Sequence, residues 1–209
     1  MACFPFLIEL ENKTCVIAGG GKVAARKVKS MLEFGASVTV IAPEIQEEIR
    51  KESEKITIIC REIEEQDLTG ADVVILATDQ QTLNHQMAQY CHKNKILVNV
   101  VDVKEDCGFY FPAIVKQEDV VVSVSTAGES PLLASYIRKE IEENLNTYYG
   151  KIAKMLGEVR EEVFSRFPLQ EDRKIVFQKL ISWGIKNEGN YEKKECQEFL
   201  EQLEKSQHQ

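Results

Sequence analysis

The sequence contains no hydrophobic run close to the ~20 apolar residues that a membrane-spanning helix requires. Its first residues, Met1-Ala2-Cys3-Phe4-Pro5-Phe6, have neither the basic start nor the long apolar core of a secretory signal peptide. We therefore expect a cytoplasmic protein with no membrane partner.

Patterns for metal sites and disulfides are also missing. The six cysteines include no C-x-x-C pair, which argues against structural zinc, and a cytoplasmic location argues against disulfides. His85 and His92 fall on one predicted helix with backbones about 10.5 Å apart, too far to chelate one ion directly. We expect no resident metal site, and we assign Cys107 no role although it follows Asp102 closely.

Positive charge is scarce. The chain has 26 Lys and Arg against 34 Asp and Glu, a net charge of −8, which argues against general nucleic-acid binding. The whole excess lies in residues 1–150, because residues 151–209 carry 11 residues of each sign. This shift supports a domain boundary near Gly150. A chain of 209 residues, 44% of them hydrophobic, suffices for one large domain or two small ones.

What the sequence does contain is a glycine turn, Gly19-Gly20-Gly21, between a strand-like segment (15–18) and a helical pattern (24–32). The G-x-G-x-x-A spacing places Gly19 at a tight turn, Gly21 where backbone approaches a pyrophosphate, and Ala24 where the helix packs on the strand. The amides and positive dipole end of the helix start suit phosphates. We predict dinucleotide binding here; the alternative is a tight turn without a ligand.

Strands and helices alternate up to residue 102. Further strands are predicted over 37–41, 56–60, 72–77 and 96–101, with helices over 44–54 and 82–94. This order is typical of a Rossmann-type, doubly wound parallel α/β sheet, whose ligands bind beyond the carboxyl ends of the strands. Thr78, Asp79 and Asp102 follow such strand ends, so we expect them to outline one site with the glycine turn.

One common determinant is absent after the second strand, where many NAD-binding folds carry an acid for the ribose hydroxyls. This chain has Ala42-Pro43, with Glu44 one step later. Glu44 either replaces that acid or is an acidic first-turn residue of the next helix. No Arg stands at this strand end to receive a 2′-phosphate, which favours NAD over NADP.

Beyond Asp102 the pattern changes to a hairpin, with strands over 109–115 and 120–125 joined by a polar turn. Ser130 as N-cap and Pro131 as first helical residue predict a helix over 131–145. Hairpin and helix either cover their own sheet or dock on a second subunit, and we favour the second. From residue 148 only helices are predicted, one ending at Pro168, one at Gly184 and one over 191–204.

Four blocks together resemble the precorrin-2 dehydrogenase family, which also forms the N-terminal half of siroheme synthase. The blocks are residues 16–27, residues 77–79 with Asn84, residues 99–102 followed by 111–113, and residues 123–134. They span most of residues 4–145 in the order and spacing of the family. The C-terminal helices match only in character.

The resemblance implies NAD-dependent oxidation of precorrin-2 to sirohydrochlorin in siroheme biosynthesis. Some family members also insert Fe²⁺ or Co²⁺ into the product, and the sequence leaves open whether this chain does so. A homodimer is implied as well. We expect an NAD-binding Rossmann domain over 1–112, a small α+β dimerisation region over 113–147, and a C-terminal helical domain over 148–209 that helps to cover the tetrapyrrole.

The resemblance also assigns residues. It places Asp102 at the position of the family's catalytic aspartate, and it carries cofactor contacts over to Lys22-Val23 and Pro43-Glu44. The oxidation removes a hydride, which NAD⁺ accepts, and a proton, which a carboxylate such as Asp102 can accept. The alternative for Asp102 is a cap on the loop after a strand.

A polycarboxylate tetrapyrrole needs cationic groups or N–H donors around it. The candidate substrate-binding residues are Arg26, Thr126 and Ser130. Lys22 and Lys29 share a helix face with Arg26, and for Lys29 we favour a solvated position.

Two other interpretations stay open. An NAD(H)-sensing regulatory domain without catalysis would account for the glycine turn, although it leaves Asp102 and the turn at 128–131 without a shared purpose. A purely structural dimer would use the glycines for a turn alone.

Overall fold

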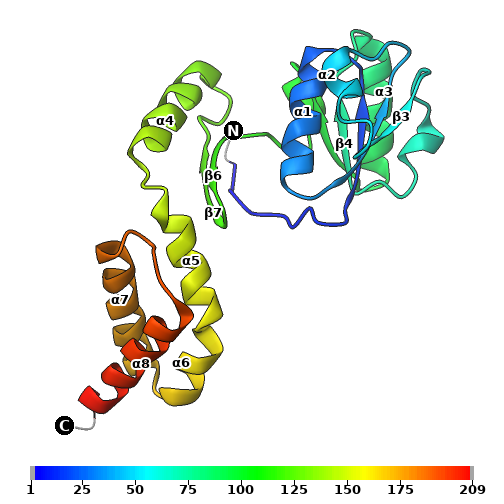
Figure 1. The fold of residues 1–209 in the computed structure, drawn as a ribbon. Coiled ribbons are helices and arrows are strands. Elements are labelled where there is room, and N and C mark those ends of the chain that lie inside the picture. The colour runs from blue at the N-terminus through cyan, green and yellow to red at the C-terminus, as the bar shows by residue number, and fades with distance from the viewer. Residues whose placement is uncertain (1–2, 208–209) are drawn as a thin grey trace. The chain divides into compact units, whose positions relative to one another are not determined.

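The computed structural model describes residues 3–207 and divides into two compact units. The first unit is Phe4–Phe111, and the second runs from Pro112 onward. Figure 1 shows a sheet with helices in the first unit, and a hairpin followed by helices α4 to α8 in the second. None of the helices in the described residues is long and apolar enough to cross a membrane.

Five strands form the sheet of the first unit. They are β1 (Thr14–Ala18), β2 (Ser37–Ile41), β3 (Thr57–Ile59), β4 (Val73–Leu76) and β5 (Leu97–Val100). All pair in parallel, in the order β3-β2-β1-β4-β5. The predicted doubly wound parallel sheet is therefore confirmed. Its strand order reverses between β1 and β4, which is where such sheets bind ligands.

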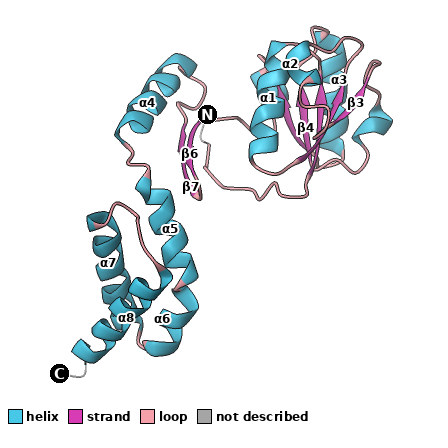
Figure 2. Cartoon of the chain, in the orientation of Figure 1, coloured by secondary structure: helices cyan, strands magenta, loops and turns pink. Residues whose placement is uncertain are grey.

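Helices α1 (Lys22–Glu33) and α3 (Gln81–Lys93) cover opposite faces of this sheet (Figure 2). Successive residues of a strand point to opposite faces. Cys15 and Ile17 accordingly belong to the core under α1, and Val16 and Ala18 to the core under α3. Both faces of β1 are thus buried, which explains why its sequence is a continuous apolar run.

The predicted helix over 44–54 is wrong in extent, because only α2 (Glu47–Arg50) is helical there. The preceding segment is bonded to the glycine turn instead, since the Gln46 N–H donates to the Gly20 carbonyl oxygen (2.9 Å). Two short 3₁₀ helices, η1 (Glu65–Leu68) and η2 (Lys104–Asp106), were not predicted.

The second unit begins with an antiparallel hairpin of β6 (Ala113–Gln117) and β7 (Val120–Val124). The hairpin was predicted, but its first strand begins four residues later than expected. Phe109 belongs to the first unit, where its N–H donates to the Val98 carbonyl oxygen (3.3 Å). Helix α4 (Pro131–Asn144) follows, and Ser130 caps it as predicted by accepting the Leu133 N–H (3.2 Å).

Four helices follow α4 in the described residues: α5 (Tyr148–Glu158), α6 (Arg160–Arg166), α7 (Gln170–Lys186) and α8 (Lys193–Gln207). The single helix predicted up to Pro168 is broken at Val159, and the bend keeps Met155 and Val163 in one core. The predicted end at Gly184 is also wrong. A Cβ there would lie 3.0 Å from Ile152 Cγ1, so this glycine serves close helix packing rather than termination.

Candidate functional site

The loops after β1, β2, β4 and β5 all lie at the carboxyl edge of the parallel sheet. These loops carry the candidate cofactor-binding and catalytic residues of the first unit. The sheet topology therefore brings together the glycine turn, Pro43-Glu44, Thr78-Asp79 and Asp102, as the sequence predicts.

The glycine turn is packed between its two neighbouring loops. Gly19 has φ +121°, and a Cβ there would overlap the Ala77 carbonyl group. A Cβ on Gly20 would overlap the carbonyl oxygen of Glu44. Gly19 N–H also donates to the Ile41 carbonyl oxygen (3.0 Å). The sequence analysis assigned no role to Gly20. The unbroken run of three glycines is the sequence feature that indicates a packing role for it.

Gly21 faces a different environment from its two neighbours. It is the N-cap of α1 with extended backbone, and a Cβ on it would meet no described atom within 4 Å. No side chain of the described residues caps the helix, and its first turn has no acid. Lys22 is exposed and Val23 is half-buried. The first amides of a helix have no intrahelical partner, so this open helix start fits the pyrophosphate of a dinucleotide.

The loop after β2 supplies Pro43 and Glu44, both exposed. Glu44 lies before Gln46, the N-cap of α2, so the interpretation of Glu44 as a first-turn residue of that helix is wrong. Its carbonyl group packs on Gly20, which leaves the carboxylate at the strand end where a ribose acid is expected.

The loop after β4 is held by a buried amide. Thr78 Oγ1 donates to Asn84 Oδ1 (2.7 Å), and Asn84 Nδ2 donates to the Thr78 carbonyl oxygen (2.9 Å). Asn84 is only 4% exposed, so its amide is committed to this loop. The Thr78 hydroxyl also accepts the Gln80 N–H (3.2 Å). Asp79 lies exposed next to Thr78.

Asp102 follows β5 in a left-handed conformation, with φ +64° and an exposed side chain. The chain then passes through η2, where Asp106 is held from α3. His85 Nδ1 lies 2.9 Å from both Asp106 carboxylate oxygens, and His92 Nε2 donates to the Asp106 carbonyl oxygen (3.0 Å). Both histidines therefore support this loop. In the described part of the chain, no group of three or more His, Cys, Asp or Glu side chains could hold a metal ion.

Lys27 is a residue that sequence reasoning did not single out. Its ammonium lies 3.4 Å from the centre of the Phe111 ring, and Phe111 packs edge-on against Phe109 at 5.1 Å. Burial, and secondarily the charge of Arg26, lower the pKa of Lys27 to about 8. Arg26 itself is exposed on the same helix.

Thr126 and Ser130 belong to the second unit. Thr126 Oγ1 donates to the Ser130 carbonyl oxygen (3.0 Å) and accepts the Ser130 N–H (3.1 Å). With Ser130 Oγ capping α4, both hydroxyls already have roles within the turn.

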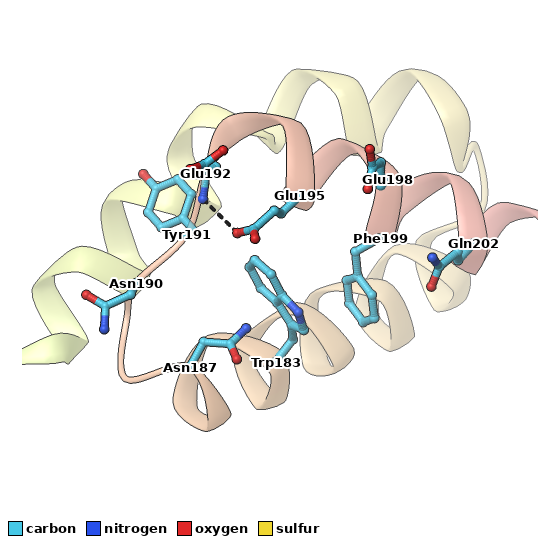
Figure 3. Close-up of a pocket in the computed structure, with 9 residues that line it drawn as sticks. All are labelled: Trp183, Asn187, Asn190, Tyr191, Glu192, Glu195, Glu198, Phe199 and Gln202. Atoms are coloured by element: carbon cyan, nitrogen blue, oxygen red, sulfur yellow. Dashed lines mark hydrogen bonds between the residues drawn. The ribbon is translucent and has the colours of Figure 1, made fainter.

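A hollow of about 710 Å³ lies between α7 and α8 in the second unit (Figure 3). Trp183 and Phe199 stack there with ring centres 5.6 Å apart. Glu192, Glu195 and Glu198 also line it. Three carboxylates repel a polycarboxylate ligand, so this hollow does not suit the expected tetrapyrrole.

Two family models match the chain. One, described as putative NAD(P)-binding, matches residues 6–113. The chain belongs to this NAD(P)-binding family. The second, described as sirohaem biosynthesis protein central, matches residues 122–144. The matched regions cover the predicted dinucleotide site, part of β7 and the whole of α4, and they support NAD as the cofactor.

Curated relatives carry the name siroheme synthase. The one from Psychrobacter sp. (strain PRwf-1) is 36% identical over 187 residues, covering 88% of this chain and 38% of that protein. The one from Photorhabdus laumondii is 38% identical over 176 residues, covering 83% and 37%. The chain thus spans less than half the length of these relatives.

Among solved structures, the chain is similar to SirC, precorrin-2 dehydrogenase, with a TM-score of 0.72 and 25% identity. The match covers 97% of this chain and 100% of that one. The resemblance found in the sequence is confirmed, and so is the α/β fold with its helical C-terminal region.

Replacing Gly20 and Gly21 separately tests the geometry of the turn. We expect Gly20→Ala to destabilise the protein by about 3 kcal/mol, because its Cβ overlaps backbone that cannot move freely. Gly21→Ala should change the free energy of unfolding by less than about 0.5 kcal/mol and yet weaken NADH binding. Denaturant unfolding and titration of NADH fluorescence measure the two effects. Equal stability of the two variants would contradict the packing described.

Lys27 predicts a pH dependence of stability. Its folded pKa of about 8 lies below the ordinary lysine value of 10.5, so between these values the unfolded chain binds more protons. The contribution of Lys27 to the free energy of unfolding therefore rises with pH between about 8 and 10.5. Comparing denaturant unfolding of wild type and Lys27→Met between the two pKa values isolates this contribution. A wild-type curve parallel to that of the variant would refute the buried ammonium.

Proposed function

We propose that this chain catalyses the NAD-dependent oxidation of precorrin-2 to sirohydrochlorin, a step in siroheme biosynthesis. The observation that carries the proposal is the likeness to SirC over essentially the whole of both chains. It is supported by the exposed carboxylate of Asp102 at the same sheet edge as an open helix start suited to a dinucleotide.

The geometry of the first unit supports a proposed role for each cofactor-binding residue. The first-turn amides of α1 at Lys22 and Val23 bind the pyrophosphate, and the space beside Gly21 admits it. The loop at Pro43-Glu44 borders the adenosine ribose, and Thr78-Asp79 borders the cofactor at the switch point. NAD⁺, when bound, supplies the hydride acceptor.

Asp102 accepts the proton that leaves the reduced macrocycle. Its side chain is exposed and lies beyond the carboxyl end of β5. Arg26, Thr126 and Ser130 are the proposed partners of the substrate carboxylates, of which Arg26 has an exposed cationic side chain on α1. For Thr126 and Ser130 the available donors are limited by the hydrogen bonds that they make within their own turn.

Metal insertion is a second candidate activity, favoured by the name siroheme synthase of the curated relatives. Fe²⁺ or Co²⁺ would enter as a co-substrate. Asp102 is again the candidate group, since a carboxylate can take up pyrrole N–H protons or briefly hold the metal.

The second unit is proposed to form a homodimer through residues 113–147, with residues 148–209 as a helical domain. Leu132, Leu133 and Tyr136 on α4 are 83%, 50% and 59% exposed. Three large apolar side chains on one short helix segment are typical of an interaction surface, and a second copy of the chain is the proposed partner.

An anaerobic assay with precorrin-2 and NAD⁺ tests the activity. We expect NADH formation, and we expect Asp102→Asn to lower kcat by about 10²-fold because the proton acceptor is lost. Asn tolerates the left-handed backbone at this position, so NADH binding should persist. Asp119→Asn, which changes an exposed carboxylate in the hairpin turn, is the control.

Three outcomes are decisive in that assay. Absence of NADH formation with authentic precorrin-2, together with intact NADH binding, would favour the NAD(H)-sensing alternative. Full activity of Asp102→Asn would remove Asp102 from the mechanism. A parallel reaction with sirohydrochlorin and Co²⁺, compared with the spontaneous rate, decides whether the chain is also a chelatase.

The proposed dimer gives a separate prediction. Leu132→Glu combined with Leu133→Glu should convert the dimer to monomer in sedimentation experiments, because the charges would be buried at the interface. Leu169→Glu changes a side chain that is 65% exposed outside α4 and should leave the assembly unchanged. A wild-type monomer at micromolar concentration would disprove the dimer.

A further inference from the structure

The thiol of Cys107 lies inside the loop that carries Asp102. Its Sγ is 3.2 Å from the Val100 nitrogen, 3.2 Å from the Val100 carbonyl oxygen and 3.2 Å from the Val103 carbonyl oxygen. Asn99 Nδ2 also points to it at 3.6 Å. The sulfur accepts the Val100 N–H and donates its hydrogen to one of the two carbonyl groups, so a single side chain contacts backbone on both sides of Asp102.

The position of β5 explains why a side chain is needed there. β5 is an edge strand of the sheet, so its outer N–H and C=O groups lack a strand partner. The returning chain supplies partners instead. Gly108 and Phe109 donate N–H bonds to the Val98 carbonyl oxygen (2.7 and 3.3 Å), and Asn99 Nδ2 donates to the Phe109 carbonyl oxygen (3.0 Å).

Cys107 continues this pairing toward the site. At Val100 the returning chain offers the thiol, which both accepts and donates. The same thiol also lies 3.2 Å from the Val103 carbonyl oxygen, on the other side of Asp102 from Val100. The thiol therefore joins the last residue of β5 to the far side of the Asp102 turn.

The turn needs such support. Asp102 has φ +64°, a conformation that is unfavourable for a non-glycine residue and persists where its surroundings hold it. Before Asp102, the Val101 N–H donates to the Leu76 carbonyl oxygen (2.9 Å). After it, His85 and His92 hold Asp106. Cys107 forms hydrogen bonds on both sides of Asp102, at Val100 and at Val103.

We propose that Cys107 is a positioning residue, whose thiol holds the Asp102 carboxylate in its working orientation by tying Val100 to Val103. The catalytic part of this inference rests on the proposed function; the structural part does not. Burial raises the pKa of the thiol, so it remains protonated and able to donate at neutral pH.

Two substitutions at Cys107 test the inference. Cys107→Ala removes both hydrogen-bonding functions, and we expect kcat to fall about tenfold, since misplacing a catalytic group by a fraction of an ångström has effects of this order. KM for NAD⁺ should stay within about twofold, because the cofactor contacts lie on other loops. Cys107→Ser keeps a donor and an acceptor and should restore kcat to within about threefold.

Cys15→Ala is the matched control. Cys15 is a fully buried thiol in the same unit, near the start of β1 and away from the carboxyl edge. We expect it to lower the melting temperature without changing kcat. An equal fall in kcat for Cys15→Ala and Cys107→Ala would assign the effect to general destabilisation and overturn the proposal.

Hydrogen–deuterium exchange of the peptide covering residues 100–107 gives a readout independent of turnover. We expect faster exchange in Cys107→Ala than in wild type, Cys107→Ser or Cys15→Ala. Unchanged exchange in Cys107→Ala would overturn the positioning role even if precorrin-2 is oxidised. Conversely, wild-type protein that oxidises no precorrin-2 would end the proposed function, while the exchange result would still decide whether the thiol orders the loop.

Discussion

The first unit depends on a backbone contact that only glycine allows. The carbonyl groups of Ala77 and Glu44 occupy the positions that side chains on Gly19 and Gly20 would take. This contact brings the loops after β2 and β4 against the start of α1. The same three-residue turn leaves Gly21 facing open space. Gly19 and Gly20 thus allow the neighbouring loops to pack against the turn because they have no side chains. Gly21 leaves the helix start accessible to a phosphate group.

The opposite end of the site is built differently. The Asp102 turn follows an edge strand, which has a neighbouring strand on one side only. On that side the Val101 N–H donates to the Leu76 carbonyl oxygen at the end of β4 (2.9 Å). Side chains support the rest of the turn, with Cys107 at Val100 and Val103, and His85 and His92 at Asp106. His85, His92 and Cys107, to which the sequence assigns no metal site or catalytic role, therefore support a loop through contacts with its backbone and with the Asp106 carboxylate.

The two family models match different units of the chain. The NAD(P)-binding match ends at residue 113, close to the change from the first unit to the second, and the sirohaem match covers residues 122–144. Likeness to SirC extends over both units, whereas the siroheme synthases from Psychrobacter and Photorhabdus are much longer than the matched region. The acidic hollow between α7 and α8 is unsuited to a polycarboxylate, so a covering role for the helical domain would have to use another of its surfaces.

The sequence by itself determined the order of strands and helices, the parallel sheet and the loops that carry the candidate site, because apolar periodicity and glycine spacing are local properties. It also predicted the Ser130 cap, which depends on residues three apart. The tertiary structure alone decided the short extent of α2, the packing role of Gly184, the burial of Lys27 and the contacts of Cys107. Each of these depends on atoms distant in sequence or on the free edge of β5. A local sequence pattern does not show which backbone N–H and C=O groups lack a hydrogen-bond partner within the secondary structure.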